Sequence, residues 1–359
     1  MHVAEKPAEI QVGDRVVRVS SPSREIFPAH AGEAAISKLE VVEYYVAVGE
    51  QICRATYERP TTLERWPKGV FEGAVLSTRS DNKGDAFFQK RIPKGAPDWV
   101  QTARISFPSG RTADEVCPTE PAVLAWAAQM GTITFHPWPV RRADVDHPDE
   151  LRLDLDPQPG ADFSDAVLVA GELRALLDDV GVTAFPKTSG GRGLHVYVRV
   201  EPRWTFTDMR YAAIATGREL ERLMPGRVTT KWWKEERPPG SVFVDYNQNA
   251  RDRTIACAYS LRPRPGAPAS TPLTWDEVVD ADPRDCTLRT VPGLVSRRGD
   301  PHAAMDDLTY GLEPMLEWHA RHLRDGLGDM PYPPDYPKMP GEPPRVQPSR
   351  KNVLNWEDA

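Results

Sequence analysis

Apolar residues recur along the chain with two different periods, and these periods mark out the predicted strands and helices. Alternation with a period of two predicts strands over residues 133–136, 151–156, 194–200, 242–246 and 254–259. A period of about 3.6 residues predicts helices capped by Ser37 and Thr119, and others over 162–180, 207–224 and 308–323. The two kinds of element do not alternate strictly, so the pattern predicts an α+β fold with largely antiparallel pairing.

Two segments depart from this pattern. Residues 71–85 (FEGAVLSTRSDNKGD) are predicted to form a long polar loop, and loops of this length often carry function. Residues 326–359 are rich in proline and are predicted to form an extended C-terminal extension, because proline fixes φ and lacks a backbone donor. The length of 359 residues allows one large core or two packed lobes.

The composition narrows the class of protein. No apolar run approaches the roughly 20 residues that span a bilayer, and the first residues lack a secretion signal, so we expect a cytoplasmic protein without a membrane partner. The four cysteines are isolated from one another, which argues against a structural zinc site or a disulfide framework.

The charge distribution is more informative than its sum. The net charge of −7 argues mildly against non-specific nucleic-acid binding, which basic proteins favour. Acidic residues, however, gather at 144–165 and 276–285, whereas basic residues gather at 87–111, 187–203 and 251–264. A metal enzyme needs acids in its site and bases around it, so this distribution is compatible with an anionic substrate.

The segment from Leu151 to Pro157, LRLDLDP, carries the strongest chemical signal. In a strand its leucines face the core, and Asp154 and Asp156 share the other face about 6–7 Å apart. Asp245, at the end of another predicted strand, is placed to join them, as in two-metal phosphoryl-transfer sites. The alternative is an ordinary solvent face, because the same spacing recurs in the predicted loop at 144–146.

Four other segments combine residue types suited to nucleotides. KTSGGRGLH at 187–195 places glycines beside a base, hydroxyls and a histidine, so backbone N–H groups can approach phosphate, although the P-loop spacing is absent. His136 lies in FHPWP, and arginines crowd 251–264, where they suit bidentate phosphate binding. FFQKR at 87–91 pairs aromatic rings with bases. Each segment also has a structural interpretation, as a turn, a packed ring or a solvated face.

Together these segments resemble the polymerase domain of bacterial non-homologous end-joining ligases, within the archaeo-eukaryotic primase superfamily. The resemblance rests on FHPWP, LDLDP, TSGGRGLH, VFVDYNQNARDRT and YSLRPRPG in that order, and it covers roughly residues 20–345. It implies a primase-polymerase core with an RRM-like antiparallel sheet and flanking helices, plus a second α/β lobe that forms a cleft. The catalytic unit of two packed lobes would span residues 1–325, followed by the 326–359 extension.

The resemblance also implies roles for individual residues. The catalytic metal ligands would be Asp154, Asp156 and Asp245. The nucleotide-binding residues would be His136, Lys187, Ser189, Gly190, His195, Gln248 and Arg262. Arg24 and Lys38 would bind a 5′-phosphate, Phe87 and Phe88 would stack on the template, and Arg65 would be a further DNA contact.

The activity implied is template-directed addition of nucleotides, preferentially ribonucleotides, to a 3′ end at short gaps or breaks during DNA repair. Its cofactor would be Mn²⁺ or Mg²⁺, and its substrates NTPs or dNTPs. The sequence departs from the usual family pattern in three ways: no ligase motif follows, Arg24 replaces the usual lysine, and 71–85 is an insertion. The chain is therefore most similar to the stand-alone actinobacterial type (primase-polymerase C), which acts with a separately encoded DNA ligase. The alternatives are an end-bridging or gap-binding scaffold for that ligase and a metal phosphoesterase or nuclease.

Overall fold

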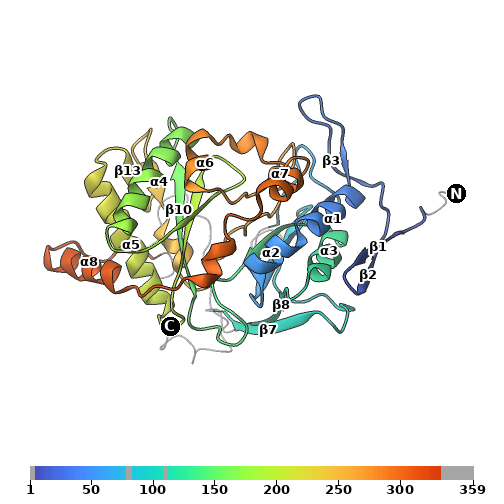
Figure 1. Ribbon diagram of the computed structural model, residues 1–359, viewed down its shortest axis with the longest axis horizontal. Helices are drawn as coiled ribbons and strands as arrows, with labels where there is room; N and C mark the ends of the chain where they lie inside the picture. Colours follow the sequence, from blue (N-terminus) through green and yellow to red (C-terminus); the bar gives the residue numbers. More distant parts are fainter. Residues whose placement is uncertain (1–4, 78–82, 108–110, 333–359) are drawn as a thin grey trace.

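The computed structural model describes residues 5–77, 83–107 and 111–332, which form two halves that lie side by side (Figure 1). The first half is built on a sheet of order β6-β5-β8-β7, with β9 also paired to β5. Its strands are β5 (Thr61–Arg65), β6 (Phe87–Gln89), β7 (Gln101–Ser106), β8 (Thr112–Cys117) and β9 (Thr132–Pro137). Its helices are α1 (Lys38–Ala47), α2 (Gly49–Thr56) and α3 (Pro121–Gln129).

Two short hairpins and a late segment complete the first half. The hairpins are β1 (Ala8–Val12) with β2 (Arg15–Val19), and β3 (Glu25–Phe27) with β4 (Ile36–Ser37). Later parts of the chain return to this core with α7 (Val291–Arg298) and with buried side chains such as Tyr259 and Leu261. The chain therefore crosses from the first half to the second and back.

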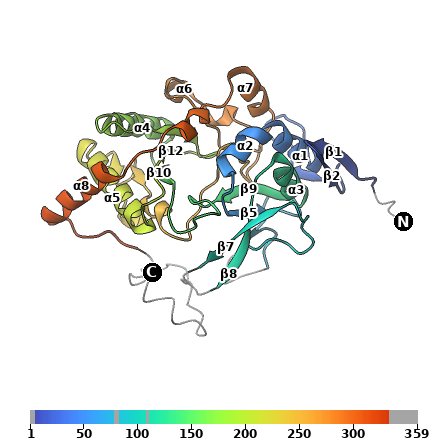
Figure 2. The same ribbon diagram turned by 60° about the horizontal axis from the view of Figure 1, so that its bottom comes forward.

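The second half is built on a sheet of order β11-β12-β10-β14-β13. Its strands are β10 (Glu150–Pro157), β11 (Phe185–Thr188), β12 (Leu194–Arg199), β13 (Val228–Thr229) and β14 (Val242–Val244). Pairing is antiparallel except between β13 and β14. One face packs against α4 (Phe163–Asp178) and α5 (Phe206–Leu223), and α8 (Glu313–Arg324) lies beside α5 (Figures 1 and 2). This mixed antiparallel architecture confirms the predicted α+β fold class.

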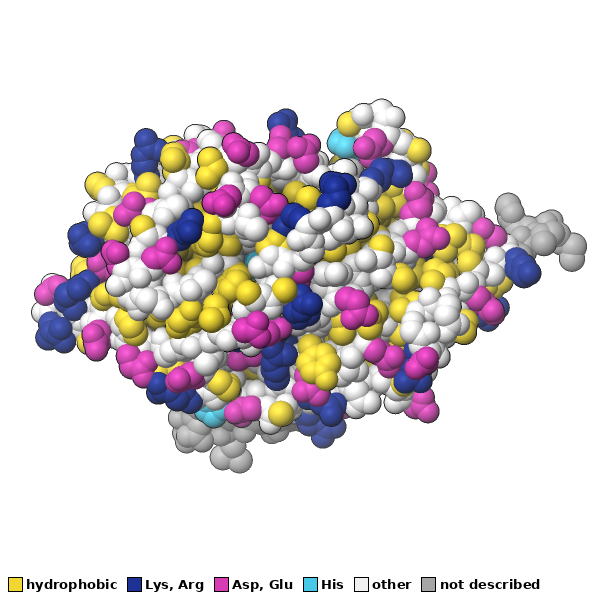
Figure 3. All heavy atoms as spheres, viewed as in Figure 1, with side chains coloured by type: hydrophobic (Ala, Val, Ile, Leu, Met, Phe, Trp, Pro, Cys, Tyr) yellow, Lys and Arg dark blue, Asp and Glu magenta, His cyan; other side chains and the backbone are white. Residues whose placement is uncertain are grey.

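Shorter helices connect these elements. They are η1 (Lys234–Glu236), η2 (Tyr246–Asn249), α6 (Trp275–Asp280), η3 (Pro283–Asp285) and η4 (Ala303–Asp307). Among the described residues, no helix is both long enough and apolar enough to cross a membrane. On the face shown in Figure 3, acidic and basic side chains are interspersed over both halves.

Most predicted elements are confirmed, and the helix caps explain where they begin. Ser37 caps α1 in a capping box, since its hydroxyl accepts the N–H of Glu40 and the Glu40 carboxylate accepts the N–H of Ser37. Asp162 caps α4 in the same way. The predicted cap at Thr119 was displaced by one residue, because α3 follows Glu120. The helix predicted from 207 begins slightly earlier, because Thr205 caps α5.

Two predicted elements were wrong in whole or in part. Residues 254–259 are not a strand, because their backbone groups bond singly to scattered partners (Cys257 to Phe135 and Tyr259 to Ser270) and Tyr259 has a φ of 63°. The last helix begins at Glu313 rather than at 308, because Tyr310 instead forms a bridge with Val200. The 71–85 segment is a loop where it is described, with one bridge between Leu76 and Ala86, whereas 78–82 and most of the extension, 333–359, lie outside the described residues.

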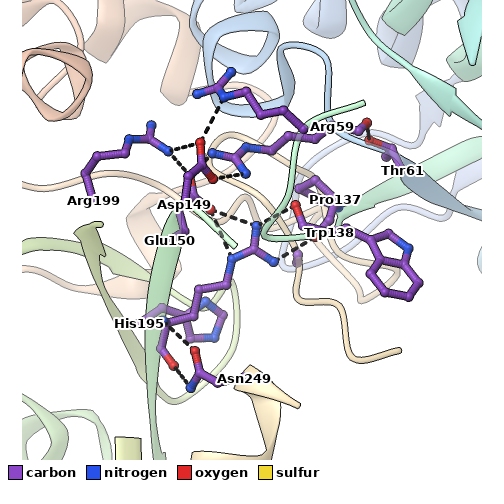
Figure 4. A network of polar contacts seen from close by, with 12 residues as sticks. Arg59, Thr61, Pro137, Trp138, Asp149, Glu150, His195, Arg199 and Asn249 are labelled. Atoms are coloured by element: carbon purple, nitrogen blue, oxygen red, sulfur yellow. Dashed lines mark hydrogen bonds and ion pairs between the residues drawn. The ribbon is translucent and has the colours of Figure 1, made fainter. Parts of the chain in front are cut away.

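A buried ion network joins the two halves (Figure 4). Arg59, which precedes β5 and has no exposed surface, binds Asp149 at 2.5 Å and Glu150 at 2.9 Å. Arg199, at the end of β12, binds the same two carboxylates, and Arg152 binds Glu150 at 2.7 Å. The network fixes the start of β10 against the first half, and so sets where the far end of β10 lies.

Candidate active site

A cavity of about 320 Å³ lies between the two sheets at the end of β10. It is formed by β9, β10, β12, η2, the glycine-rich turn at 189–193 and the 254–264 segment. Seven of the predicted site residues line it: His136, Asp154, Asp156, Ser189, His195, Gln248 and Arg262. The fold therefore brings together side chains that lie up to 126 positions apart in the sequence.

The carboxylates reach the cavity through the alternation of β10. Leu151, Leu153 and Leu155 lie in the core of the second half, so Asp154 and Asp156 project from the opposite face. Oδ1 of Asp154 is buried and accepts no hydrogen bond within the described part of the chain. Burial, reinforced by the charges of Asp156 and Asp245, raises the pKa of Asp154 well above its ordinary value.

Asp245 lies directly after β14 and beside this pair. Its backbone N–H donates to the carbonyl of Asp154 at 3.0 Å. Its carboxylate accepts hydrogen bonds from the N–H of Asn247 at 3.1 Å and from Nε2 of Gln248 at 3.0 Å. Burial raises the pKa of Asp245 as well. Burial and mutual repulsion therefore disfavour the charged forms of these acids, although nearby arginines partly oppose this effect.

The chemistry of this donor set fits a hard divalent cation. Carboxylate oxygens are the preferred ligands of Mg²⁺ and Mn²⁺, and Asp154 offers a buried oxygen without a partner. Within the described residues, no group of three or more His, Cys, Asp and Glu side chains converges closely enough to hold a metal ion as it stands. The carboxylate of Asp245 is oriented by hydrogen bonds from Asn247 and Gln248, one to each oxygen.

His195 is held by a lysine that does not reach the cavity. Lys187 in β11 is fully buried, and its Nζ donates to Nδ1 of His195 at 2.7 Å, to the carbonyl of Ala256 at 3.0 Å and to Oγ of Ser270 at 2.5 Å. Since Nδ1 accepts, we assign the ring proton to Nε2, which lies 3.4 Å from Oδ1 of Asp154. Burial lowers the pKa of His195 well below its ordinary value and that of Lys187 to about 7.

The glycine-rich turn is braced by its own serine. Oγ of Ser189 accepts the N–H groups of Gly191 at 3.1 Å and Gly193 at 3.2 Å. Gly190 has a φ of 70°, and a Cβ there would lie 2.4 Å from Cγ of Arg262. Only glycine allows this turn to pack so closely against Arg262. Gly190 itself lines a neighbouring cavity of about 820 Å³ rather than the one that holds the carboxylates.

Three residues were missed by the sequence analysis as site residues. Arg192 and Arg264 line the same cavity as Arg262. Burial raises the pKa of Asp156, and the charges of nearby arginines, these three among them, partly oppose the rise. Arg192 stands inside the TSGGRGLH motif, which was the available signal. Sequence spacing could not predict Glu64 as a site residue, because its contact depends on the pairing of β5 with β9. This pairing places Oε2 of Glu64 2.9 Å from Nε2 of His136.

The predicted DNA contacts lie outside this cavity. Arg24 is exposed, and Lys38 is buried with its Nζ donating to the carbonyl of Ser20 at 2.7 Å. Burial, followed by the charge of Arg24, lowers the pKa of Lys38 to about 8. Two cations therefore lie close enough for the charge of one to act on the other, which is an arrangement suited to an anion.

The predicted aromatic pair does not form one surface. Phe87 lies under the guanidinium of Arg65, 5.3 Å from it, whereas the exposed Phe88 meets His136 edge-on at 5.5 Å. Adjacent residues of a strand point to opposite faces, so only Phe88 lies beside a residue of the cavity. Arg65 also donates two hydrogen bonds to the carbonyl of Met130 and one to Gln89, so its guanidinium supports the first half of the fold.

The fold and the site define a nucleotidyltransferase of the primase-polymerase class. Residues 37–302 match the family model described as LigD, primase-polymerase domain, and the chain belongs to this family. It is 32% identical over 292 residues to the multifunctional non-homologous end joining protein LigD of Mycolicibacterium smegmatis, an alignment that covers 81% of this chain and 36% of that protein. It is 35% identical over 264 residues to the protein of the same name from Pseudomonas aeruginosa, covering 73% and 29%.

A solved structure agrees with this placement. The polymerase domain from Mycobacterium tuberculosis Ligase D, determined in complex with DNA, matches with a TM-score of 0.71 and 30% identity. The match covers 81% of this chain and 98% of that one. The chain spans about a third of the length of the relatives named above.

Proposed function

We propose that this protein adds nucleotides to a 3′ end at short gaps or breaks in DNA, under the direction of a template, with residues 1–325 acting as one catalytic unit. The observation that carries the proposal is the carboxylate pair formed by the buried Asp154 and the exposed Asp156, with an unpartnered oxygen on Asp154, facing a cavity that Arg192, Arg262 and Arg264 also line. A nucleoside triphosphate needs positive charge along its phosphates, and divalent metals need carboxylates next to them.

Each group of residues has a role in this reaction. The 3′ hydroxyl oxygen forms a bond to the α-phosphorus and its proton passes to solvent, while the bond from the α-phosphorus to the oxygen bridging to the β-phosphate breaks and pyrophosphate leaves. Asp154 and Asp156, joined by Asp245, would hold Mn²⁺ or Mg²⁺, which supplies Lewis-acid chemistry when bound. The three arginines balance the charge of the triphosphate, and the N–H groups of the 189–193 turn can donate to phosphate oxygens.

His195 and His136 orient the nucleotide. Lys187 keeps Nε2 of His195 protonated and directed toward Asp154, so this nitrogen can donate to a phosphate oxygen. Glu64 fixes the ring of His136 from β5 through the opposite kind of contact, because its carboxylate accepts from Nε2 of His136. Gln248 contacts both the cavity and Asp245, and so connects the nucleotide site with the third carboxylate. The preference for ribonucleotides is part of the proposal and rests on the resemblance.

A second candidate function is supported by the cation pair Arg24 and Lys38. Two neighbouring cations outside the cavity favour a DNA end or a 5′-phosphate, so the protein would also bridge gaps or ends for a separately encoded ligase. This role is compatible with nucleotide addition. A metal phosphoesterase or nuclease remains the third candidate, because the same carboxylates can activate water.

The test is extension of a labelled primer across a short gap that carries a 5′-phosphate. Mn²⁺ would be supplied, rNTPs would be compared with dNTPs, and Asp154→Ala would remove the central carboxylate. Asp146→Ala is the matched control, since the exposed Asp144–Asp146 segment repeats the spacing outside the cavity. We expect template-matched addition that is lost in Asp154→Ala and kept in Asp146→Ala.

The other outcomes decide between the candidates. Addition by Asp154→Ala at the wild-type rate would refute the site. Tight gap binding without any addition would establish the scaffold, and shortening of the strand without added nucleotide would establish the nuclease. A higher rate with rNTPs than with dNTPs would support the ribonucleotide preference.

A further inference from the structure

A buried arginine connects the third carboxylate to a segment near the end of the described chain. Arg210 lies in α5, on the side of the second sheet away from the cavity. Its Nε donates to Oδ1 of Asn247 at 2.8 Å, and its terminal nitrogens reach Oδ1 of Asp329 at 3.3 Å and the carbonyl of Met330 at 2.6 Å. All three nitrogens are therefore used, and one guanidinium holds both η2 and residues 328–332, which we call the strap.

Asn247 passes this constraint to Asp245. Its side-chain amide accepts from Arg210 and donates to the carbonyl of Pro331 at 3.1 Å. Its backbone N–H donates to Oδ1 of Asp245 at 3.1 Å. The hydroxyl of Tyr246 donates to the same carbonyl of Pro331 at 3.2 Å. The turn that follows Asp245 is thus tied to the strap at two consecutive residues.

The surroundings of Arg210 require an arginine. Its guanidinium stacks between the rings of Tyr246 and Tyr332, with centroids 5.4 and 5.3 Å away. A lysine keeps the charge but offers neither a planar face nor a three-way fork. A second tie, from Arg218 to the carbonyl of Gly328 at 2.6 Å, fixes the start of the strap on the same helix. Residues 328–332 lie beyond the 37–302 region that matches the family model.

We propose that Arg210 and the strap are positioning elements that fix the orientation of the Asp245 carboxylate through Asn247 and thereby set the affinity of the site for its divalent metal. The proposal rests on the proposed function, which makes Asp245 a metal ligand. Groups that orient a ligating carboxylate through hydrogen bonds contribute to metal affinity without touching the metal. The strap, 84 residues along the chain from Asn247, would then control the catalytic turn from the outer side of the sheet.

The test uses the full chain with two substitutions. Arg210→Lys keeps the charge and removes the fork, and Asn247→Ala removes the link while keeping the backbone N–H. Arg222→Ala is the matched control, because Arg222 lies on the same helix and binds Glu219 without a contact to the strap in the described structure. Binding of Mn²⁺ alone, measured by electron paramagnetic resonance, should weaken by about 10–100-fold in both variants and stay unchanged in the control.

A second measurement separates positioning from general loss of structure. Amide hydrogen exchange should accelerate at residues 245–249 in both variants, while β10 and β12 stay protected. Raising the Mn²⁺ concentration should restore nucleotide addition, since the defect lies in metal affinity. Two folded variants with the Mn²⁺ affinity and the exchange pattern of the wild type would overturn the inference. A wild-type protein that neither binds Mn²⁺ nor extends a primer would instead refute the proposed function and this inference with it.

Discussion

Replacing Arg59 by methionine tests whether the buried ion network holds the two halves together. Arg59 is fully buried and binds two carboxylates that are themselves almost fully buried (Figure 4). Methionine preserves much of the apolar volume but leaves Asp149 and Glu150 with only part of their compensating charge, from Arg199, Arg141 and Arg152. Removal of one partner from a buried pair typically costs about 3–5 kcal/mol, so we expect a loss in the free energy of unfolding within that range.

The stability that the ion network contributes should depend on pH, and the direction follows from the pKa shifts of its carboxyl groups. Burial opposes ionisation of Asp149 and Glu150, but the charges of Arg59 and Arg199 hold the pKa of both below the ordinary value, with help from Arg141 at Asp149 and from Arg152 at Glu150. A carboxyl group with a lowered pKa in the folded state stabilises the protein above its unfolded pKa of about 4. That stability is lost as the pH falls toward the folded value. The difference between wild type and variant should therefore be constant from pH 7 to 5 and decrease below about pH 4.

Urea denaturation at several pH values measures this difference from the midpoints and slopes. Arg104→Met is the matched control, because Arg104 forms an exposed pair with Asp114 and should show no measurable loss. A loss of less than about 1 kcal/mol for Arg59→Met at pH 7 would refute the reasoning, because it would place the pair among surface ion pairs. A difference that persisted unchanged at pH 3 would show that charge is not its cause.

Three further substitutions test the site itself. Lys187→Met should leave Nδ1 of His195 without its donor and slow nucleotide addition by about 100-fold, because the ring is misplaced. The ¹⁵N chemical shifts of His195 should report a changed tautomer, and an unchanged tautomer would contradict the assignment of the ring proton to Nε2. Gly190→Ala should raise the KM for nucleotide because its Cβ would collide with Arg262. Gly181→Ala is the control: Gly181 has a similar φ of 73° but open space around it, so this substitution should cost only backbone strain of about 1–3 kcal/mol and leave KM unchanged. Phe88→Ala should weaken binding to gapped DNA by about 1–3 kcal/mol, and Phe87→Ala should weaken it less; equal losses would argue against the opposite-face geometry.

The alternation of residues 151–156 was enough to predict both the strand and the side of it on which Asp154 and Asp156 lie. This was possible because period two and a continuous row of leucines are local properties, and β10 satisfies them as expected. The same reasoning was wrong for 254–259, where alternation is present but the backbone forms only single hydrogen bonds, such as that of Cys257 to Phe135, and no strand ladder within the described structure. Periodicity reports which side of a segment is buried, and it does not report what the backbone will bond to.

The sequence by itself determined the α+β class, most helices and strands, and the set of acids, bases and glycines that the site is made from. Only the tertiary structure decided which of these residues contact one another. It placed Lys187 behind His195, brought Glu64 to His136 across paired strands, and linked Asn247 to Pro331 over 84 residues. These contacts depend on strand register and on the packing of one half against the other. Such long-range geometry is fixed by the whole fold, and no local pattern in the chain carries it.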